Sequence, residues 1–261
     1  MVRRPVTTGI VQWMYNAAWP KLYWQLYDYY LTPNGAFFGA RTACRPRNLI
    51  YDYGTGAVWA VNDAPDPVVA ATAEVRVFDL QSKQVFATSR ALDIRPDVPI
   101  KVADLPAVRG LTPVYFLDLR LRGQNGAPLA SSFYWLSTKK DVLDPKSTEW
   151  FVTANKEYAD FTALAQLPEV EIQATQRIEE VEGRKFVHLS LVNPSPSVAF
   201  FIELRLVGAT TGKTVVPVLW DDNYVSLLPG EQRELTATVE GRAAGNEPLV
   251  VHYAGCNVKP R

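Results

Sequence analysis

The chain has 261 residues, and 48% of them are hydrophobic, which is enough to bury the cores of two or three domains. Its 27 basic and 27 acidic residues cancel, so no net field is available to attract nucleic acid or an anionic membrane surface. No segment reaches the roughly 20 apolar residues that a membrane span needs, and no secretion signal is visible. We therefore expect an ordered globular protein with no nucleic-acid or membrane partner. The sequence does not indicate the cellular compartment. If the chain is part of a longer protein, any export signal would precede residue 1.

The first elements differ from all that follow. Residues 9–15 form a near-continuous apolar run, as is typical of a strand covered on both faces. Apolar and aromatic residues then recur at helical spacing from Pro20 to Tyr30, until Pro33-Asn34-Gly35 ends the run. This pattern predicts a strand, an aromatic loop and an amphipathic helix. A second short helix is expected over FGARTACR, after which the chain should become extended.

From residue 47 the apolar period changes from that of a helix to that of a strand. In PVYFLDLRLRG, Tyr115 and Leu117 point one way while the charged residues point the other. About seven such strands over residues 47–141 indicate an immunoglobulin-like β-sandwich. Residues 142–160 are mostly polar without periodicity and are expected to form a linker. The alternation returns over residues 161–261 and predicts a second sandwich, so the fold class is mainly β, with two copies of one fold.

Cysteine and tryptophan positions give expectations about burial. Cys44 and Cys256 lie near opposite ends of the chain, which suits neither a disulfide scaffold nor a zinc site, so both should be free and buried. Trp59, Trp135 and Trp220 fall within predicted strands. Large aromatic residues dominate the cores of sandwiches, and we expect these three in the core.

The sequence offers no candidate catalytic residues. Asp28 is the single acid before residue 47 and is expected to be a surface charge on the first helix. His188 and His252 lie on polar strand faces, and no G-x-S-x-G elbow is present. No catalytic residue, cofactor or metal ligand is predicted. Asp221 and Asp222, in WDDNY, leave two alternatives open: a calcium site or a loop stabilised by their own side chains.

Trp13, Asn16 and Trp19 are the candidate binding residues. They cluster where the first predicted strand ends and its loop begins. In (β/α)₈ barrels, active sites are built on this face. Two interpretations stay open: the residues pack the rim of a barrel, or they offer a platform on which sugar rings stack.

Several segments resemble glycoside hydrolase family 2, in its branch of exo-β-D-glucosaminidases, mannosylglycoprotein endo-β-mannosidases and β-mannosidases. The segments QWMYNAAWP, LYDYYL and FFGARTACRPRNLIYDY look like the end of that family's barrel and its exit into an immunoglobulin-like domain. FYWLSTKKDVLD is similar to the end of that domain, and FTALAQLP with LWDDNYVSLLPGE resembles the C-terminal sandwich. The resemblance implies that residues 1–46 are the last strand and helix of a TIM barrel.

The resemblance also implies a parent enzyme that hydrolyses glycosides with retention, using two glutamates on earlier barrel strands. Neither glutamate exists in this chain, so we expect an accessory C-terminal part that is catalytically incompetent alone. Trp13 matches the family's tryptophan that lines the glycone subsite, and Asn16 and Trp19 match the loop beside it. The substrate class that we favour for this parent is β-linked glucosamine in chitosan oligosaccharides. Mannosides attached to N-glycans are the second choice. The parent is expected to be secreted or periplasmic.

Two other classes of protein stay open. A free-standing carbohydrate-binding module predicts exposed coplanar tryptophans, and an immunoglobulin-like interaction protein predicts a protein partner without glycan affinity. The aromatic helix would expose a large apolar patch. Unless the helix packs on the first sandwich or pairs with another chain, we therefore expect a homodimer, aggregation, or docking on the remainder of the glycosidase through this face.

Overall fold

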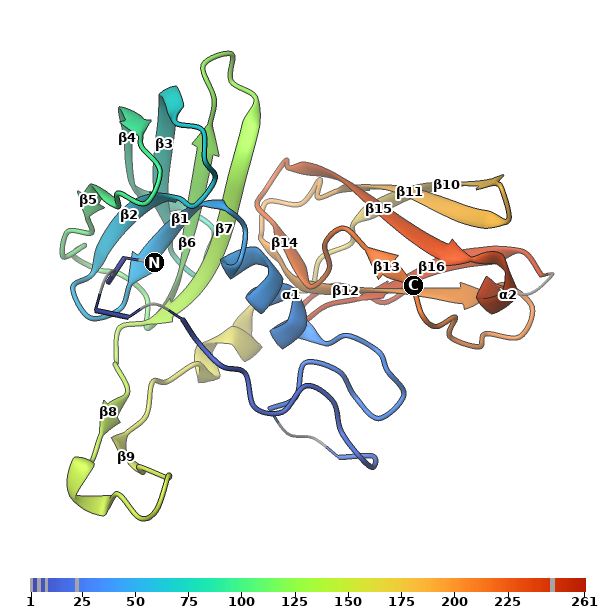
Figure 1. Ribbon diagram of the computed structural model, residues 1–261, viewed down its shortest axis with the longest axis horizontal. Helices are drawn as coiled ribbons and strands as arrows, with labels where there is room; N and C mark the ends of the chain where they lie inside the picture. Colours follow the sequence, from blue (N-terminus) through green and yellow to red (C-terminus); the bar gives the residue numbers. More distant parts are fainter. Residues whose placement is uncertain (1, 4–5, 8, 22–23, 245–246) are drawn as a thin grey trace. The chain divides into compact units, whose positions relative to one another are not determined.

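The regular secondary structure of the computed structural model is mostly antiparallel β-sheet (Figure 1). It describes residues 2, 3, 6, 7, 9–21, 24–244 and 247–261. The chain divides into two compact units: unit 1 is Met1–Gly9 with Ala43–Leu167, and unit 2 is Ile10–Thr42 with Pro168–Arg261. No helix in the described part of the chain is long and apolar enough to cross a membrane.

Unit 1 contains the first expected sandwich, which is confirmed. Seven strands form two sheets, of order β1-β2-β5 and β4-β3-β6-β7. Their bounds are β1 Arg47–Asp52, β2 Ala57–Asn62, β3 Val68–Phe78, β4 Gln84–Ile94, β5 Ile100–Asp104, β6 Val114–Arg122 and β7 Pro128–Ser137. On β6, Leu117, Leu119 and Leu121 are fully buried, so the period-2 pattern identified the face of this strand that packs in the core.

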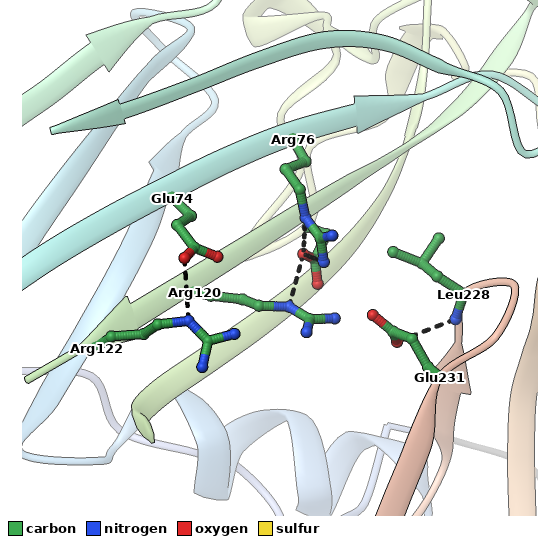
Figure 2. Close-up of polar contacts among 7 residues, drawn as sticks. Glu74, Arg76, Arg120, Arg122, Leu228 and Glu231 are labelled. Atoms are coloured by element: carbon green, nitrogen blue, oxygen red, sulfur yellow. Dashed lines mark hydrogen bonds and ion pairs between the residues drawn. The ribbon is translucent and has the colours of Figure 1, made fainter. Parts of the chain in front are cut away.

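The other face of β6 carries ion pairs rather than a simple wet surface (Figure 2). Arg76 and Arg120 both donate to Oδ2 of Asp118, at 2.6 and 3.0 Å. Arg122 donates to Oε1 of Glu74 at 3.0 Å. Asp118 is buried, and a buried carboxylate is retained only with such partners. The alternation of the sequence located these charges but did not indicate which of them pair, either along β6 or across to β3.

Unit 2 contains the second expected sandwich, which is also confirmed. Its sheets have the orders β10-β11-β15-β13 and β14-β12-β16. The bounds are β10 Gln173–Val181, β11 Arg184–Val192, β12 Ala199–Gly208, β13 Leu219–Trp220, β14 Val225–Leu227, β15 Gln232–Glu240 and β16 Leu249–Ala254, with a short helix α2 at Gly241–Ala244. Between β14 and β15 the chain turns at Gly230, whose φ is 74°, and Glu231 accepts a hydrogen bond from the amide of Leu228 at 3.1 Å (Figure 2).

The two sandwiches repeat one strand topology. Strands β10, β11 and β15 pair as β1, β2 and β5 do, and β14, β12 and β16 pair as β4, β3 and β6 do. The first sandwich adds β7 beside β6, and the second adds β13 beside β15. Within the described residues each sandwich therefore has seven strands, divided three and four between its sheets.

Residues 142–160, expected to form a linker, contain an ordered hairpin. Its strands are β8 (Val142–Leu143) and β9 (Asn155–Glu157), with a 3₁₀ turn at Pro145–Ser147 between them. Asp144 caps that turn by accepting from the amide of Lys146 at 3.1 Å. A second 3₁₀ turn follows at Thr162–Gln166. Short polar strands of this kind have no periodicity that a sequence pattern can reveal.

The strand and helix expected between residues 9 and 31 are not formed. Residues 9–15 make no strand, and residues 20, 21 and 24–31 make no helix. Leu22 and Tyr23, also on the expected helix, lie outside the described residues. A barrel strand needs hydrogen-bonded neighbours and covering helices, and the strands that the structure describes belong to the two sandwiches and a short hairpin instead. A short amphipathic helix without a surface to pack on is marginal in water.

The second expected helix is confirmed as α1, Gly35–Ala43. Two expectations about burial were wrong. Cys44 and Cys256 are free, but both are exposed, because each follows the end of a regular element. Trp135 is also exposed, since the even-numbered residues of β7, such as Leu136, face the core. Trp220 is buried, as expected.

Candidate functional site

The candidate residues lie in a folded-back loop of unit 2, which we call the aromatic segment (residues 10–31). The carbonyl of Tyr15 accepts from the amides of Leu26 and Tyr27, both at 3.1 Å. Gln12 Nε2 donates to the carbonyl of Trp24 at 3.2 Å. These bonds within the segment replace the sheet pairing that was expected for it.

Asn34 connects the aromatic segment to α1. Its Oδ1 accepts from the amide of Phe37 at 3.2 Å, as an N-cap does, and its Nδ2 donates to the carbonyl of Gln25 at 2.6 Å. The Pro33-Asn34-Gly35 sequence, interpreted above as the end of a helix, is therefore the start of one. Asparagine caps helices as readily as it forms turns, so the local sequence alone did not separate the two roles.

A chain of aromatic rings anchors the segment in unit 2. The ring centroids of Tyr15 and Tyr27 are 5.0 Å apart, those of Tyr27 and Phe37 are 5.1 Å apart, and those of Phe37 and Phe38 are 5.1 Å apart. Phe38 is buried in the core of the second sandwich, with Tyr224 at 6.0 Å. The anchor of this segment therefore lies in the core of the second sandwich.

Tyr224 is held by a charged pair on β12. Its hydroxyl donates to Oε1 of Glu203 at 3.0 Å, and Arg205 donates two bonds of 2.9 Å to the same carboxylate. Burial, followed by the negative charge of Glu203, raises the pKa of Tyr224 well above its ordinary value. The phenol therefore stays neutral and serves as a fixed donor. A Cβ on Gly35 would lie 2.9 Å from the ring of Phe201 beside it, which explains a glycine at the start of α1.

The predicted binding residues are exposed in this chain. Trp13 has 74% of its surface exposed and Trp19 has 60%, and Asn16 is exposed as well. The ammonium of Lys21 lies 4.7 Å from the ring centroid of Trp19, a cation–π contact. The contacts of the described residues do not join Trp13, Asn16 and Trp19 into one wall. The indole of Trp13 and the part of the Trp19 indole that Lys21 leaves uncovered are exposed for stacking on an apolar or sugar surface.

Two features of the segment were not anticipated from the sequence. Gln25 is only 3% exposed, and its Nε2 has no acceptor among the described residues. An orphaned buried donor is rare and costs about 1–3 kcal/mol. Burial, followed by a hydrogen bond with Tyr15, raises the pKa of Tyr27 to about 12. A lone glutamine between aromatic residues carries no sequence signal for burial, so neither feature was predictable.

The acidic candidates are used in local structure. Asp28 was expected on a helix surface, but its Oδ1 accepts from the amide of Thr32 at 2.8 Å and closes a turn. Asp221 Oδ1 accepts from the amides of Asp222 and Thr236 at 2.8 and 2.9 Å. Arg233 pairs with the carboxylate of Asp222. The structure thus supports the side-chain-stabilised loop, and no group of three potential metal ligands occurs within the described ranges.

Two family models match the chain. The "Exo-beta-D-glucosaminidase Ig-fold domain" matches residues 150–258, and the "Mannosidase Ig/CBM-like domain" matches residues 54–141. These ranges include most of the second and first sandwiches, respectively. The division into two immunoglobulin-like domains therefore has independent support.

Curated relatives extend the match toward the N-terminus. The exo-β-D-glucosaminidase of Arthroderma benhamiae is 37% identical over 232 residues, which are 89% of this chain and 26% of the relative. That of Streptomyces avermitilis is 36% identical over 237 residues, 88% of this chain and 26% of the relative. The chain thus spans about a quarter of the length of the curated relatives that it matches, as the 26% coverage shows.

Solved structures give the same result. The Amycolatopsis orientalis exo-chitosanase CsxA superposes with a TM-score of 0.92 at 30% identity, over 97% of this chain and 30% of that one. The β-D-mannosidase of Dictyoglomus thermophilum shares the fold, with a TM-score of 0.62 at 15% identity, over 95% of this chain and 26% of that one. The two sandwiches therefore belong to the immunoglobulin-fold domains of exo-β-D-glucosaminidases and mannosidases, and the chain corresponds to the C-terminal portion of a family 2 glycoside hydrolase.

Proposed function

We propose that the chain is the C-terminal accessory part of an enzyme that removes β-linked glucosamine from chitosan oligosaccharides with retention. The observation that carries this proposal is the match to curated exo-β-D-glucosaminidases over 89% of the chain but only 26% of the relative. In such an enzyme the sandwiches buttress a catalytic barrel. The isolated chain is expected to have no hydrolytic activity, since both catalytic glutamates of the family would lie on barrel strands outside it.

The state of the aromatic segment supports this role. Exposed Trp13 and Trp19 and the orphaned amide of Gln25 are what an incomplete interface leaves behind. Within the larger enzyme, residues 9–15 would form the last barrel strand. Trp13, Asn16 and Trp19 would then border the glycone subsite and bind the glycan.

A chimera tests the proposal. The matched portion of the Amycolatopsis orientalis enzyme is replaced by this chain, and hydrolysis of 4-nitrophenyl β-D-glucosaminide is measured. We expect turnover by the chimera and none by the isolated chain. Trp13→Ala should lower kcat/KM about tenfold or more, which corresponds to about 1.4 kcal/mol of transition-state stabilisation. Tyr30→Ala, at another exposed aromatic of the segment, is the matched control and should retain activity. A folded but inactive chimera would contradict the proposal.

We also propose that the isolated chain forms a homodimer through the aromatic segment, because the aromatic residues Trp13 and Trp19 expose 74% and 60% of their surface to water. Light scattering after size exclusion should show a dimer that the double change Trp13→Ser and Trp19→Ser makes monomeric. Truncation is a poorer test, since removal of α1 would take Phe38 out of the core of the second sandwich. A wild-type chain that stays monomeric at all concentrations would contradict this idea.

A further inference from the structure

The hairpin of β8 and β9 carries an exposed apolar tip, which we call the hairpin knob (Trp150, Phe151 and Val152). Trp150 is 88% exposed and Phe151 is 68% exposed. Their ring centroids are 4.0 Å apart with 54° between the ring planes. In Figure 1 the hairpin extends away from the sandwich of its own unit. Large aromatic side chains at such a tip contribute little to the core of either sandwich.

The knob sits on a strained turn. Glu149 and Val152 exchange two main-chain hydrogen bonds of 2.9 Å, which close a two-residue turn. The first residue of this turn, Trp150, has a φ of 54°. Glycine is favoured at that position of a hairpin, and a bulky residue there is an outlier. Strain of this kind concentrates at functional sites, so the tryptophan points to a role outside the folding of this chain.

The rest of the hairpin holds the knob in place. The hydroxyls of Thr148 and Thr153 hydrogen-bond to each other at 2.9 Å, and Ser147 Oγ donates to the carbonyl of Asp144 at 2.8 Å. The amide of Asp144 donates to the carbonyl of Ala154 at 2.9 Å. The hydroxyls near the tip are thus engaged within the hairpin. What the tip presents is an apolar wedge on a hydrogen-bonded backbone, whose order reduces the entropy lost on binding.

We infer that the hairpin knob inserts into an apolar pocket on the catalytic barrel portion of the larger glycosidase. This inference rests on the proposed function. The chain matches only 26% of its relatives' length, so most of such an enzyme is available as the partner. Buried tryptophan anchors dominate the energetics of protein interfaces.

A sugar ligand fits the knob less well than a protein pocket does. The rings of Trp150 and Phe151 are inclined by 54° and form a wedge, whereas stacking on a sugar needs a flat open face. Sugar recognition also needs polar groups beside the ring, and the threonine hydroxyls behind the tip already bind each other. The aliphatic side chain of Val152 adds apolar surface that a protein pocket covers better.

Hydrogen exchange in the chimera described above tests the inference. Peptides covering residues 148–154 are compared between the isolated chain and the chimera, and we expect exchange at least tenfold slower in the chimera. Trp150→Gly should leave the Tm of the isolated chain unchanged or higher, because glycine relieves the strained φ. The same change should lower the Tm of the chimera and restore fast exchange. Leu219→Ser, at an exposed apolar position of unit 2, is the matched control and should do neither.

Each failure has a separate meaning. An active chimera with unprotected 148–154 peptides would overturn the knob and leave the proposed function standing. An inactive chimera in which the 148–154 peptides are protected would support docking of the knob and contradict the proposed function. Protection that appears only after chitosan oligosaccharide is added would make the knob a sugar platform and overturn docking. Destabilisation of the isolated chain by Trp150→Gly would assign the tryptophan a structural role and overturn the inference as well.

Discussion

Asn62 and Asn193 make the same hydrogen bonds at the same position of the two sandwiches. Asn62 ends β2, and its Nδ2 donates to the carbonyl of Ile94 at the end of β4, at 3.2 Å. Asn193 follows β11, and its Nδ2 donates to the carbonyl of Leu227 at the end of β14, at 2.9 Å. Each also donates, at 2.8 Å, to the carbonyl four residues later in its own loop. Since β2 and β4 belong to different sheets, as do β11 and β14, each buried amide fastens one sandwich together.

Alanine at either asparagine should destabilise the sandwich that contains it. Each change leaves several buried backbone groups without partners, so we expect a loss of about 2–3 kcal/mol in the free energy of unfolding. Urea unfolding should show Asn62→Ala lowering the transition of unit 1 and Asn193→Ala that of unit 2. Asn125→Ala, on an exposed turn, should change stability by no more than about 0.5 kcal/mol. Equal, small effects of all three would show that the buried amides do not fasten the sheets.

The contrast between these asparagines and the aromatic segment shows what the sequence allowed us to predict. Strand alternation is local, so the buried positions of β6 were predicted from the spacing of Leu117 and Leu119 alone. The repeats VNDAPDP and VNPSPSV contain the two asparagines, but only the strand topology shows that they are equivalent. The conformation of residues 9–21 and 24–31 depends on partners that are distant in the sequence, and there the local pattern was wrong.

The sequence identified candidate site residues, but it did not predict the contacts that surround and position them. Trp13 and Trp19 were selected from their place after an apolar run, and the structure leaves both exposed. The contacts that position their loop come from Phe38 and Tyr224, which are far apart in the sequence. No periodicity links α1 to the second sandwich, so this packing required the structure.

Phe38→Ala should unfold unit 2 more readily and release the aromatic segment. Phe38 is buried among the core residues of the second sandwich, and truncating a buried phenylalanine costs about 3–5 kcal/mol. The free energy of unfolding from urea titration measures the loss. Phe161→Ala, at an exposed site, is the control and should cost less than about 1 kcal/mol. A loss of less than about 1 kcal/mol in both variants would mean that α1 contributes nothing to the core.

A cluster of tyrosines in unit 1 predicts a loss of stability at alkaline pH. The rings of Tyr51 and Tyr134 are 6.1 Å apart, with Tyr53 beside both and Tyr115 hydrogen-bonded to Tyr51. Burial, followed by the proximity of Tyr51, raises the pKa of Tyr115 to about 12. Burial is likewise the largest cause that raises the pKa values of the other three.

The sign of this effect follows from proton linkage. Between the ordinary pKa of tyrosine, 10, and about 12, the unfolded chain has lost the proton of Tyr115 while the folded chain retains it. The stabilisation is therefore complete below pH 10 and is lost as the pH rises toward 12. Tyr115→Phe should reduce the slope of unfolding free energy against pH in this range and leave the slope between pH 7 and 9 unchanged. An unchanged alkaline slope would rule out Tyr115 as a contributor.

Two glycines should respond in opposite directions to alanine. A Cβ on Gly255 would lie 2.9 Å from the carbonyl oxygen of Phe200 and 3.0 Å from Val258, and the backbone oxygen has no room to move because the amide of Cys256 binds it at 3.0 Å. We expect Gly255→Ala to cost about 1–3 kcal/mol, as overpacking does. A Cβ on Gly39, in α1, would meet nothing within 4 Å. Gly39→Ala should therefore stabilise the helix by up to about 1 kcal/mol, since alanine has the higher helix propensity. Thermal unfolding of the pair decides the matter: a destabilising Gly39→Ala would show that this face of α1 is covered by another surface, as it would be in a dimer or in the larger enzyme.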